Sequence, residues 1–223
     1  MGCGSRTRRW TVGLAVALLA GSVAALAGET AQPRHLIYLH GRIVQVEQSK
    51  RPLHPQFGYY ELEAILDAFR ERGFVVSGEM RSKTASVSDS ADRVVEQVRK
   101  LLASGVHPEF VTVVGASMGA AIALLASARL SNPEVRFAVL GACLSTSVRG
   151  LLAEEGRRPR GRVLAIREAS DDLEGPCPPF GDDSESRSAL VVREIVLNTG
   201  LGHGFFYRPL PEWVNPVLEW ASR

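Results

Sequence analysis

Short apolar segments rich in β-branched residues alternate along the chain with longer segments of helical periodicity. The short segments predict strands, and they are residues 35–39, 74–80, 110–115, 136–143, 162–167 and 191–197. The longer ones predict helices at residues 59–72, 90–104, 117–130, 145–156 and 211–220. This alternation is typical of an α/β fold, with a mainly parallel sheet of about six strands flanked by helices.

Residues 42–58 interrupt the alternation. The segment contains Pro52 and Pro55, which lack backbone N–H donors, so we expect it to be irregular. No internal repeat or domain linker is visible, so we expect residues 28–223 to form one domain.

Composition supports this interpretation. The chain has 223 residues, of which 45% are apolar and 22% charged, as in ordinary globular proteins. The net charge is +2, and removing Arg6, Arg8 and Arg9 leaves +2 − 3 = −1. A charge so close to zero favours no nucleic-acid partner.

Residues 1–27 resemble a secretory signal peptide. Arg6, Arg8 and Arg9 form a basic start, residues 11–25 are apolar, and Ala25-Leu26-Ala27 fits a cleavage site. We therefore expect a mature chain that starts at Gly28, is secreted or periplasmic, and has no stable membrane anchor after cleavage. The alternative is that the segment is retained as an anchor, although its apolar part is short for a full span.

Secretion changes the interpretation of the cysteines. With Cys3 removed, the mature chain keeps Cys143 and Cys177. An even pair in an oxidising compartment predicts one disulfide, and the alternative is two free buried thiols.

The sequence Gly115-Ala116-Ser117-Met118-Gly119 lies between a predicted buried strand and an Ala/Leu-rich predicted helix. Strand, G-x-S-x-G and helix in this order predict a nucleophile elbow, a sharp turn that exposes the hydroxyl of Ser117. Glycines Gly115 and Gly119 are expected because the turn leaves no room for side chains there. The alternative is an ordinary glycine-rich turn with an incidental serine.

A serine nucleophile needs a base and an acid that orients the base. His203 is the candidate base, because it follows the last predicted strand in the glycine-rich loop 199–204. The acid should follow the strand at 162–167. We prefer Asp171, with Asp172 as the alternative, because Asp171 is nearer the strand end.

The first predicted strand ends at His40-Gly41-Arg42. We expect the backbone N–H groups of Arg42 and Met118 to form an oxyanion hole, with His40 and Gly41 beside the pocket. The alternative is a plain turn that ends the strand. Glu79 and Arg81 lie at the end of the second predicted strand, where they either line the pocket or pair with each other.

The elbow, the His-Gly turn, the acid after a strand and the Gly-His-Gly loop together resemble the α/β-hydrolase superfamily of serine hydrolases over residues 36–220. The resemblance implies a sheet with the predicted strands in the order 2-1-3-4-5-6. Two departures stand out. The two leading antiparallel strands usual in the superfamily look absent, and the segment 144–161, where a lid is often inserted, is short.

These features predict a secreted serine hydrolase with a small-molecule acyl substrate, most readily a carboxylic ester. Peptidase, thioesterase and acyltransferase activity use the same triad. A non-catalytic binding protein on a hydrolase scaffold is the alternative from another class. No cofactor is expected, and the histidines and cysteines lack metal-ligand spacing. The sequence does not set the oligomeric state.

Overall fold

A six-stranded parallel sheet forms the centre of the structure, a computed structural model that describes residues 1, 2, 4, 32–143, 146–173 and 190–223. The strand order is β4-β1-β5-β6-β7-β8, which confirms the order expected from the sequence. The strands are β1 His35–Leu39, β4 Val75–Ser77, β5 Val111–Ala116, β6 Arg136–Leu140, β7 Gly161–Glu168 and β8 Leu190–Leu197. Parallel pairing brings all carboxyl ends to one edge, where ligands bind in open α/β sheets.

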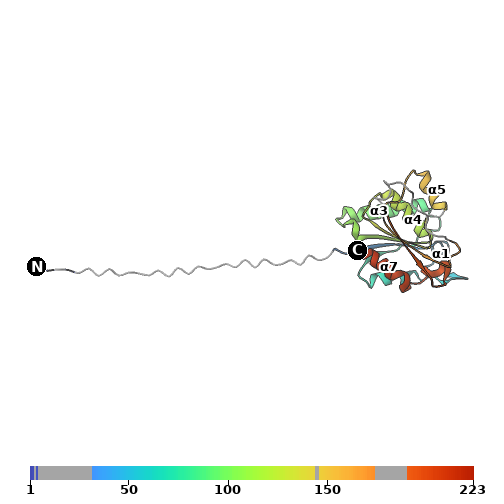
Figure 1. Ribbon diagram of the computed structural model, residues 1–223, viewed down its shortest axis with the longest axis horizontal. Coiled ribbons are helices and arrows are strands. Elements are labelled where there is room, and N and C mark those ends of the chain that lie inside the picture. Colours follow the sequence, from blue (N-terminus) through green and yellow to red (C-terminus); the bar gives the residue numbers. More distant parts are fainter. Residues whose placement is uncertain (3, 5–31, 144–145, 174–189) are drawn as a thin grey trace. The chain divides into compact units, whose positions relative to one another are not determined.

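Helices cover both faces of this sheet (Figure 1). The longer helices are α2 Leu62–Arg70, α3 Val87–Ala103, α4 Met118–Leu130, α5 Thr146–Glu154 and α7 Pro211–Ser222. The short helix α1 spans Arg42–Glu47, and 3₁₀ turns η1 and η2 span Pro108–Phe110 and Gly202–Phe206. Parallel strands need such crossovers, because a tight turn cannot join them.

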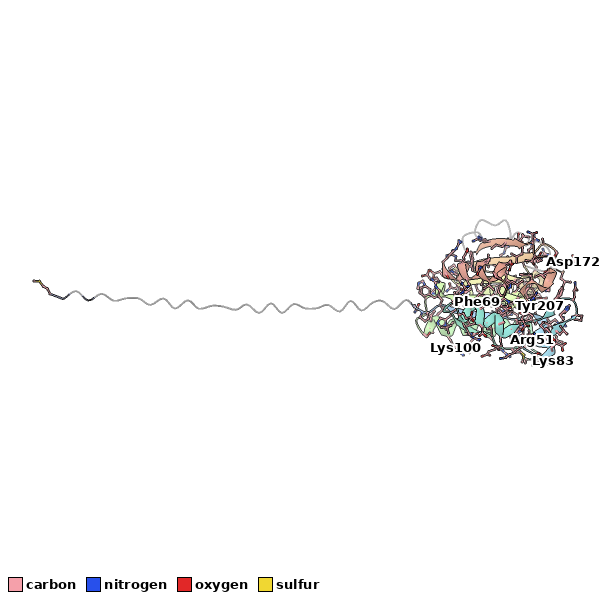
Figure 2. The ribbon with its side chains drawn as sticks, turned by 90° about the horizontal axis from the view of Figure 1, so that it is seen from below. Arg51, Phe69, Lys83, Lys100, Asp172 and Tyr207 are labelled. Carbon is pink, nitrogen blue, oxygen red and sulfur yellow. The ribbon has the colours of Figure 1, made fainter. Side chains whose placement is uncertain are left out.

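Alternate side chains of the four central strands, β1, β5, β6 and β7, enter two different cores. On β1, Ile37 and Leu39 pack with α3, α4 and α5, whereas Leu36 and Tyr38 pack with α2 and α7. Figure 2 shows the second face from below, with Phe69 of α2 and Tyr207 labelled. Burial on both faces explains why these central strands are mainly apolar, whereas the edge strand β8 exposes Arg193 and Glu194.

The prediction for residues 42–58 was wrong. These residues form α1 and a small antiparallel pair, β2 Leu53–His54 and β3 Gly58–Tyr59. Pro52 does not prevent this. Its missing N–H is not used, because Pro52 takes part only through its carbonyl oxygen, which accepts a hydrogen bond from Tyr60 N at 2.9 Å. Elsewhere the predicted elements exist, although the helix expected from residue 59 begins at Leu62, and β4 and β6 end three residues earlier than expected.

The expected signal peptide lies almost wholly outside the described residues, so its cleavage and the mature start at Gly28 stay predictions. Residues 32–223 form one compact unit. Among the described helices, none has the length and apolarity to cross a membrane. Cys143 is disulfide-bonded, but Cys177 lies outside the described residues, so the pairing of these two stays a prediction.

Candidate active site

Ser117 occupies a strained turn between β5 and α4. Its φ and ψ are 51° and −115°, a region that non-glycine residues rarely adopt. A Cβ on Gly115 would collide with the carbonyl of Gly119, and a Cβ on Gly119 would collide with the carbonyl of Leu39. The two glycines therefore allow a turn so tight that the end of β1 packs directly against it.

His203 lies between Ser117 and Asp171. Its Nε2 is 2.9 Å from Ser117 Oγ, and its Nδ1 is 2.7 Å from Asp171 Oδ2. The Asp171 side chain has no exposed area, and that of His203 is 10% exposed. A carboxylate at Nδ1 favours the tautomer that leaves Nε2 free to accept the serine proton.

Asp171, rather than Asp172, is the acid at this histidine. Asp172 is exposed and is seen at the periphery in Figure 2. Asp171 Oδ1 accepts a hydrogen bond from Leu173 N at 2.9 Å, which fixes the orientation of the carboxylate.

Glu168, which the sequence reasoning missed, connects the loops that carry the acid and the base. Its buried carboxylate accepts hydrogen bonds from Thr199 N, Thr199 Oγ1 and Gly200 N at 2.7–3.3 Å. Burial alone would raise the pKa of Glu168, but these hydrogen bonds hold it below its usual value. Ser170 Oγ bonds both Glu168 and Gly202 N, so the loops after β7 and β8 are joined beside the triad.

The turn after β1 is held from outside by Arg81. Arg81 N donates to His40 Nε2 at 3.0 Å, and Arg81 Nη2 donates to the His40 carbonyl at 2.6 Å. Since a backbone N–H only donates, His40 Nε2 must be the acceptor, and Nδ1 carries the proton that is shared with Gly41 O at 2.8 Å. Burial, together with the Arg81 charge, lowers the pKa of His40 to about 4.

Of the expected pocket residues, Gly41 lines the cavity at Ser117, whereas His40, Glu79 and Arg81 do not. Arg81 Nε bonds Gln45 Oε1 of α1 at 3.0 Å, and among the described residues no ion pair joins Arg81 to Glu79. The structure thus assigns Arg81 to support of the His40-Gly41-Arg42 turn. Because its partners His40 and Gln45 are distant in sequence, the sequence alone did not indicate this role.

Two helices begin at Ser117 and the His-Gly turn. Arg42 is the first residue of α1, and Met118 is the first residue of α4. The N–H groups of the first helical turn have no acceptor within the helix, and the helix dipole makes that end positive. The geometry is therefore suited to an anionic oxygen beside Ser117.

A cavity of about 360 Å³ opens at the triad. Arg42, Gly41, Ser117 and His203 all line it, and its walls include an aromatic cluster, the rings of His54, Phe57, Tyr60, Phe206 and Tyr207. The sequence reasoning missed this cluster, although the clustered aromatics at 57–60 and 205–207 were a visible signal. The β2–β3 pair carries His54 into contact with Phe57, with ring centroids 4.5 Å apart. The cavity is thus apolar on one side and polar at Ser117.

No group of acidic, histidine or cysteine residues in the described part of the chain could hold a metal ion. None of the protein-family models and none of the curated protein sequences with which the chain was compared matches it. Solved structures do match. SOBER1 from Arabidopsis thaliana superposes with a TM-score of 0.51 at 17% identity, over 86% of this chain and 99% of that one.

An α/β hydrolase enzyme, MGS-MChE2, from a sediment metagenome of the Mar Chica lagoon in Morocco, superposes with a TM-score of 0.50 at 17% identity. The match covers 86% of this chain and 91% of that protein. The protein has the α/β-hydrolase fold. In this α/β-hydrolase fold the candidate triad stands at the carboxyl ends of β5, β7 and β8, and the His-Gly turn stands at the end of β1.

Proposed function

We propose that the protein is a serine hydrolase that cleaves carboxylic esters of small molecules through an acyl-enzyme. The observation that carries the proposal is the hydrogen-bonded series Ser117–His203–Asp171 at the wall of a cavity. A structural serine needs neither a strained backbone nor a histidine at hydrogen-bonding distance, so this combination favours catalysis.

In the proposed reaction, Ser117 Oγ attacks the ester carbonyl while His203 Nε2 takes its proton. Asp171 stabilises the imidazolium that forms. The N–H groups of Arg42 and Met118 bind the oxyanion of the tetrahedral intermediate. His203 then donates the proton to the leaving alcohol, and a water molecule activated by His203 releases the acid and restores Ser117.

A fluorophosphonate probe tests the nucleophile. We expect labelling at Ser117 alone, and Ser117→Ala should abolish labelling while the protein stays folded. His203→Ala should reduce kcat for a nitrophenyl ester on the order of 10⁶-fold, because triad members act as a unit. A correctly folded wild-type protein that takes no label and hydrolyses no activated ester would refute the proposal. That result would favour the alternative of a non-catalytic binding protein on a hydrolase scaffold.

A matched pair of variants tests the acid. Asp171→Asn should lower kcat on the order of 10⁴-fold, because an amide at this position favours the wrong histidine tautomer. Asp172→Asn, one residue away and exposed, should leave kcat close to that of the wild type. The reverse result would assign the acid to Asp172.

Peptidase, thioesterase and acyltransferase reactions proceed through the same acyl-enzyme, so they are separated by substrate rather than by residue. Matched oxyester, thioester and amide substrates with one acyl group compare them directly. We expect the highest kcat/KM for the oxyester. A thioester or amide preferred by more than tenfold would change the substrate class without changing the catalytic residues.

We also propose that residues 1–27 direct secretion. The support is the order of basic, apolar and small residues in the sequence. Expression of the full chain in a secreting bacterial host, followed by N-terminal sequencing of the exported protein, should give a start at Gly28. A membrane-bound protein with residues 1–27 intact would support the retained anchor instead.

A further inference from the structure

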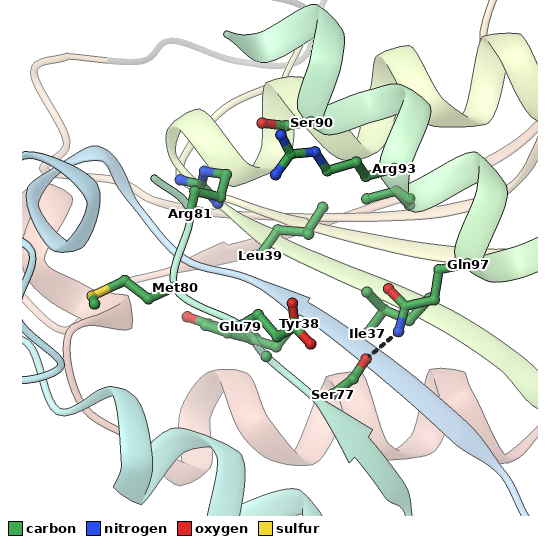
Figure 3. A pocket seen from close by; sticks show the side chains of 12 residues that line it. Ile37, Tyr38, Leu39, Ser77, Glu79, Met80, Arg81, Ser90, Arg93 and Gln97 are labelled. Atoms are coloured by element: carbon green, nitrogen blue, oxygen red, sulfur yellow. Dashed lines mark hydrogen bonds between the residues drawn. The ribbon is translucent and has the colours of Figure 1, made fainter. Parts of the chain in front are cut away.

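One end of the cavity at Ser117 is built from aromatic rings. The β2–β3 pair and its turn carry His54 and Phe57, Tyr207 follows η2, and all three line the cavity. The rings of His54 and Phe57 stack with centroids 4.5 Å apart, and Tyr207 meets Phe57 edge to face at 5.5 Å. A smaller cavity between β1, residues 77–81 and helix α3 shares no lining residue with this one (Figure 3).

Phe57 packs directly on the loop that carries the base. A Cβ on Gly204 would lie 2.7–2.9 Å from three carbon atoms of Phe57, so a glycine is needed for the ring to come this close. The ring centroids of Phe57 and His203 are 6.3 Å apart. His54 Nδ1 accepts hydrogen bonds from Gln56 N and Phe57 N at 3.2 and 3.3 Å, which holds the turn between β2 and β3. Packing and hydrogen bonds thus fix Phe57 beside the base.

The chemistry of the base decides which part of an ester meets these rings. His203 Nε2 must give its proton to the leaving oxygen, so that oxygen lies within about 3 Å of Nε2 when the ester bond breaks. The carbon atoms attached to this oxygen therefore lie beside His203, where Phe57 is partly exposed and Phe206 is buried. The carbonyl oxygen lies instead at the N–H groups of Arg42 and Met118.

This end of the cavity favours an uncharged aromatic group. Apart from His203, the ionic side chains of the lining are those of Arg42 and Glu47, and both belong to α1. Burial raises the pKa of Tyr207 to about 12, so its phenol stays neutral near pH 7. A ring that meets other rings edge to face or offset gains attraction beyond the area it buries, which a saturated group does not.

The size of the cavity is consistent with one such ring. Its volume of about 360 Å³ lies near the lower end of the range for small-molecule sites, roughly 300–1,000 Å³. The cavity therefore has room for one ring together with a short acyl group.

We propose that the cavity takes esters of aromatic alcohols, with the ring of the leaving alcohol against Phe57 and His54. This inference rests on the proposed hydrolase activity and names the class of alcohol that the reaction releases. Phe57 is then the residue that determines specificity for the alcohol, and the acyl group lies away from it.

A ratio of kcat/KM values measured within each protein tests the proposal. Benzyl acetate and cyclohexylmethyl acetate give the same acetyl-enzyme and release primary alcohols of similar acidity, so the ratio reports how the ring packs. The wild type should prefer benzyl acetate roughly two- to tenfold. The preference should disappear in Phe57→Leu, which keeps an apolar side chain. It should persist in Phe110→Leu, the matched control, since Phe110 is also partly buried and does not line the cavity.

A second pair of esters places the ring on the acid instead. The ratio of kcat/KM for ethyl phenylacetate to that for ethyl cyclohexylacetate should be the same in the wild type and in Phe57→Leu. A general loss of activity, such as a displaced His203 would cause, changes neither ratio. The two ratios therefore separate recognition of the alcohol from damage to the triad.

Four results would overturn the proposal while leaving the hydrolase intact. These are no preference for benzyl acetate in the wild type, an unchanged preference in Phe57→Leu, an equal loss of preference in Phe110→Leu, or a second ratio that depends on Phe57. A folded wild type that hydrolyses none of the four esters and takes no fluorophosphonate label would refute the hydrolase itself, and this inference with it.

Discussion

The buried His40 should make the stability of the protein depend on pH. The imidazole has no exposed area, its Nδ1–H bonds Gly41 O, and its Nε2 accepts from Arg81 N. Protonation would place a second N–H against the Arg81 N–H and a charge beside a guanidinium. We therefore expect acid to break this arrangement, and with it the turn that carries Arg42.

The magnitude follows from the pKa. Burial first, and the Arg81 charge second, lower the pKa of His40 from 6.5 to about 4. A lowered pKa for a base means that the folded state binds fewer protons than the unfolded state between these values. The contribution of neutral His40 to the free energy of unfolding is thus complete above pH 6.5 and is lost as the pH falls to about 4. At 1.36 kcal/mol per unit, the loss is roughly 3 kcal/mol.

Urea unfolding from pH 7.5 to pH 4, followed by tryptophan fluorescence, measures this loss. His40→Gln removes the titrating group and keeps an amide that can accept from Arg81 N. Carboxylates titrate in both proteins, so the difference between the two curves isolates His40. The wild type should lose roughly 3 kcal/mol more than the variant over this range. Parallel curves would refute the assignment of His40 as a buried neutral acceptor.

Three further predictions use other parts of the structure. Arg136 is 1% exposed, and none of its guanidinium nitrogens has a partner in the described part of the chain. Because burying an unpaired charge is costly, Arg136→Met should stabilise the protein by about 2 kcal/mol, or roughly 4–8 °C in Tm. Arg129→Met is the control and should destabilise, because Arg129 bonds Glu155; a lower Tm for Arg136→Met in calorimetry would contradict the argument. Thiol titration of the unfolded, unreduced mature protein should find no free thiol, and reduction of the predicted Cys143–Cys177 disulfide should cost roughly 3–4 kcal/mol, whereas two reactive thiols would exclude it. Among nitrophenyl esters, kcat/KM should be highest for short acyl chains, and a steady rise towards long chains with activation at a lipid interface would show that the expected open site is wrong.

The fold and the geometry of the candidate triad were predictable because both depend on local signals along the chain. The central strands β1, β5, β6 and β7 appear as mainly apolar segments, and Ser117, Asp171 and His203 each follow a strand end. Parallel topology then places these ends at one edge without any knowledge of loop structure. The order of strands came from the resemblance rather than from the residues themselves.

What the sequence did not predict depends on contacts between distant residues. The β2–β3 pair has two residues in each strand and is fixed by contacts such as Glu61 N to Tyr207 O at 2.8 Å. Arg81 supports the His40 turn from 41 positions away, and Glu168 meets Thr199 from 31 positions away. Single polar residues in loops carry no periodicity, so no pattern could indicate these partners.

The hydrogen bond between Ser117 and His203 joins residues that are 86 positions apart. Closing a loop of this length costs entropy before the contact is gained, so we expect this contact to form late in folding. The base belongs to η2, after the last strand of the sheet, so a chain that lacks its C-terminal part has a serine and no base. On refolding, recovery of the proposed esterase activity should therefore follow recovery of helical signal, and that activity would measure completed folding rather than folded fraction alone.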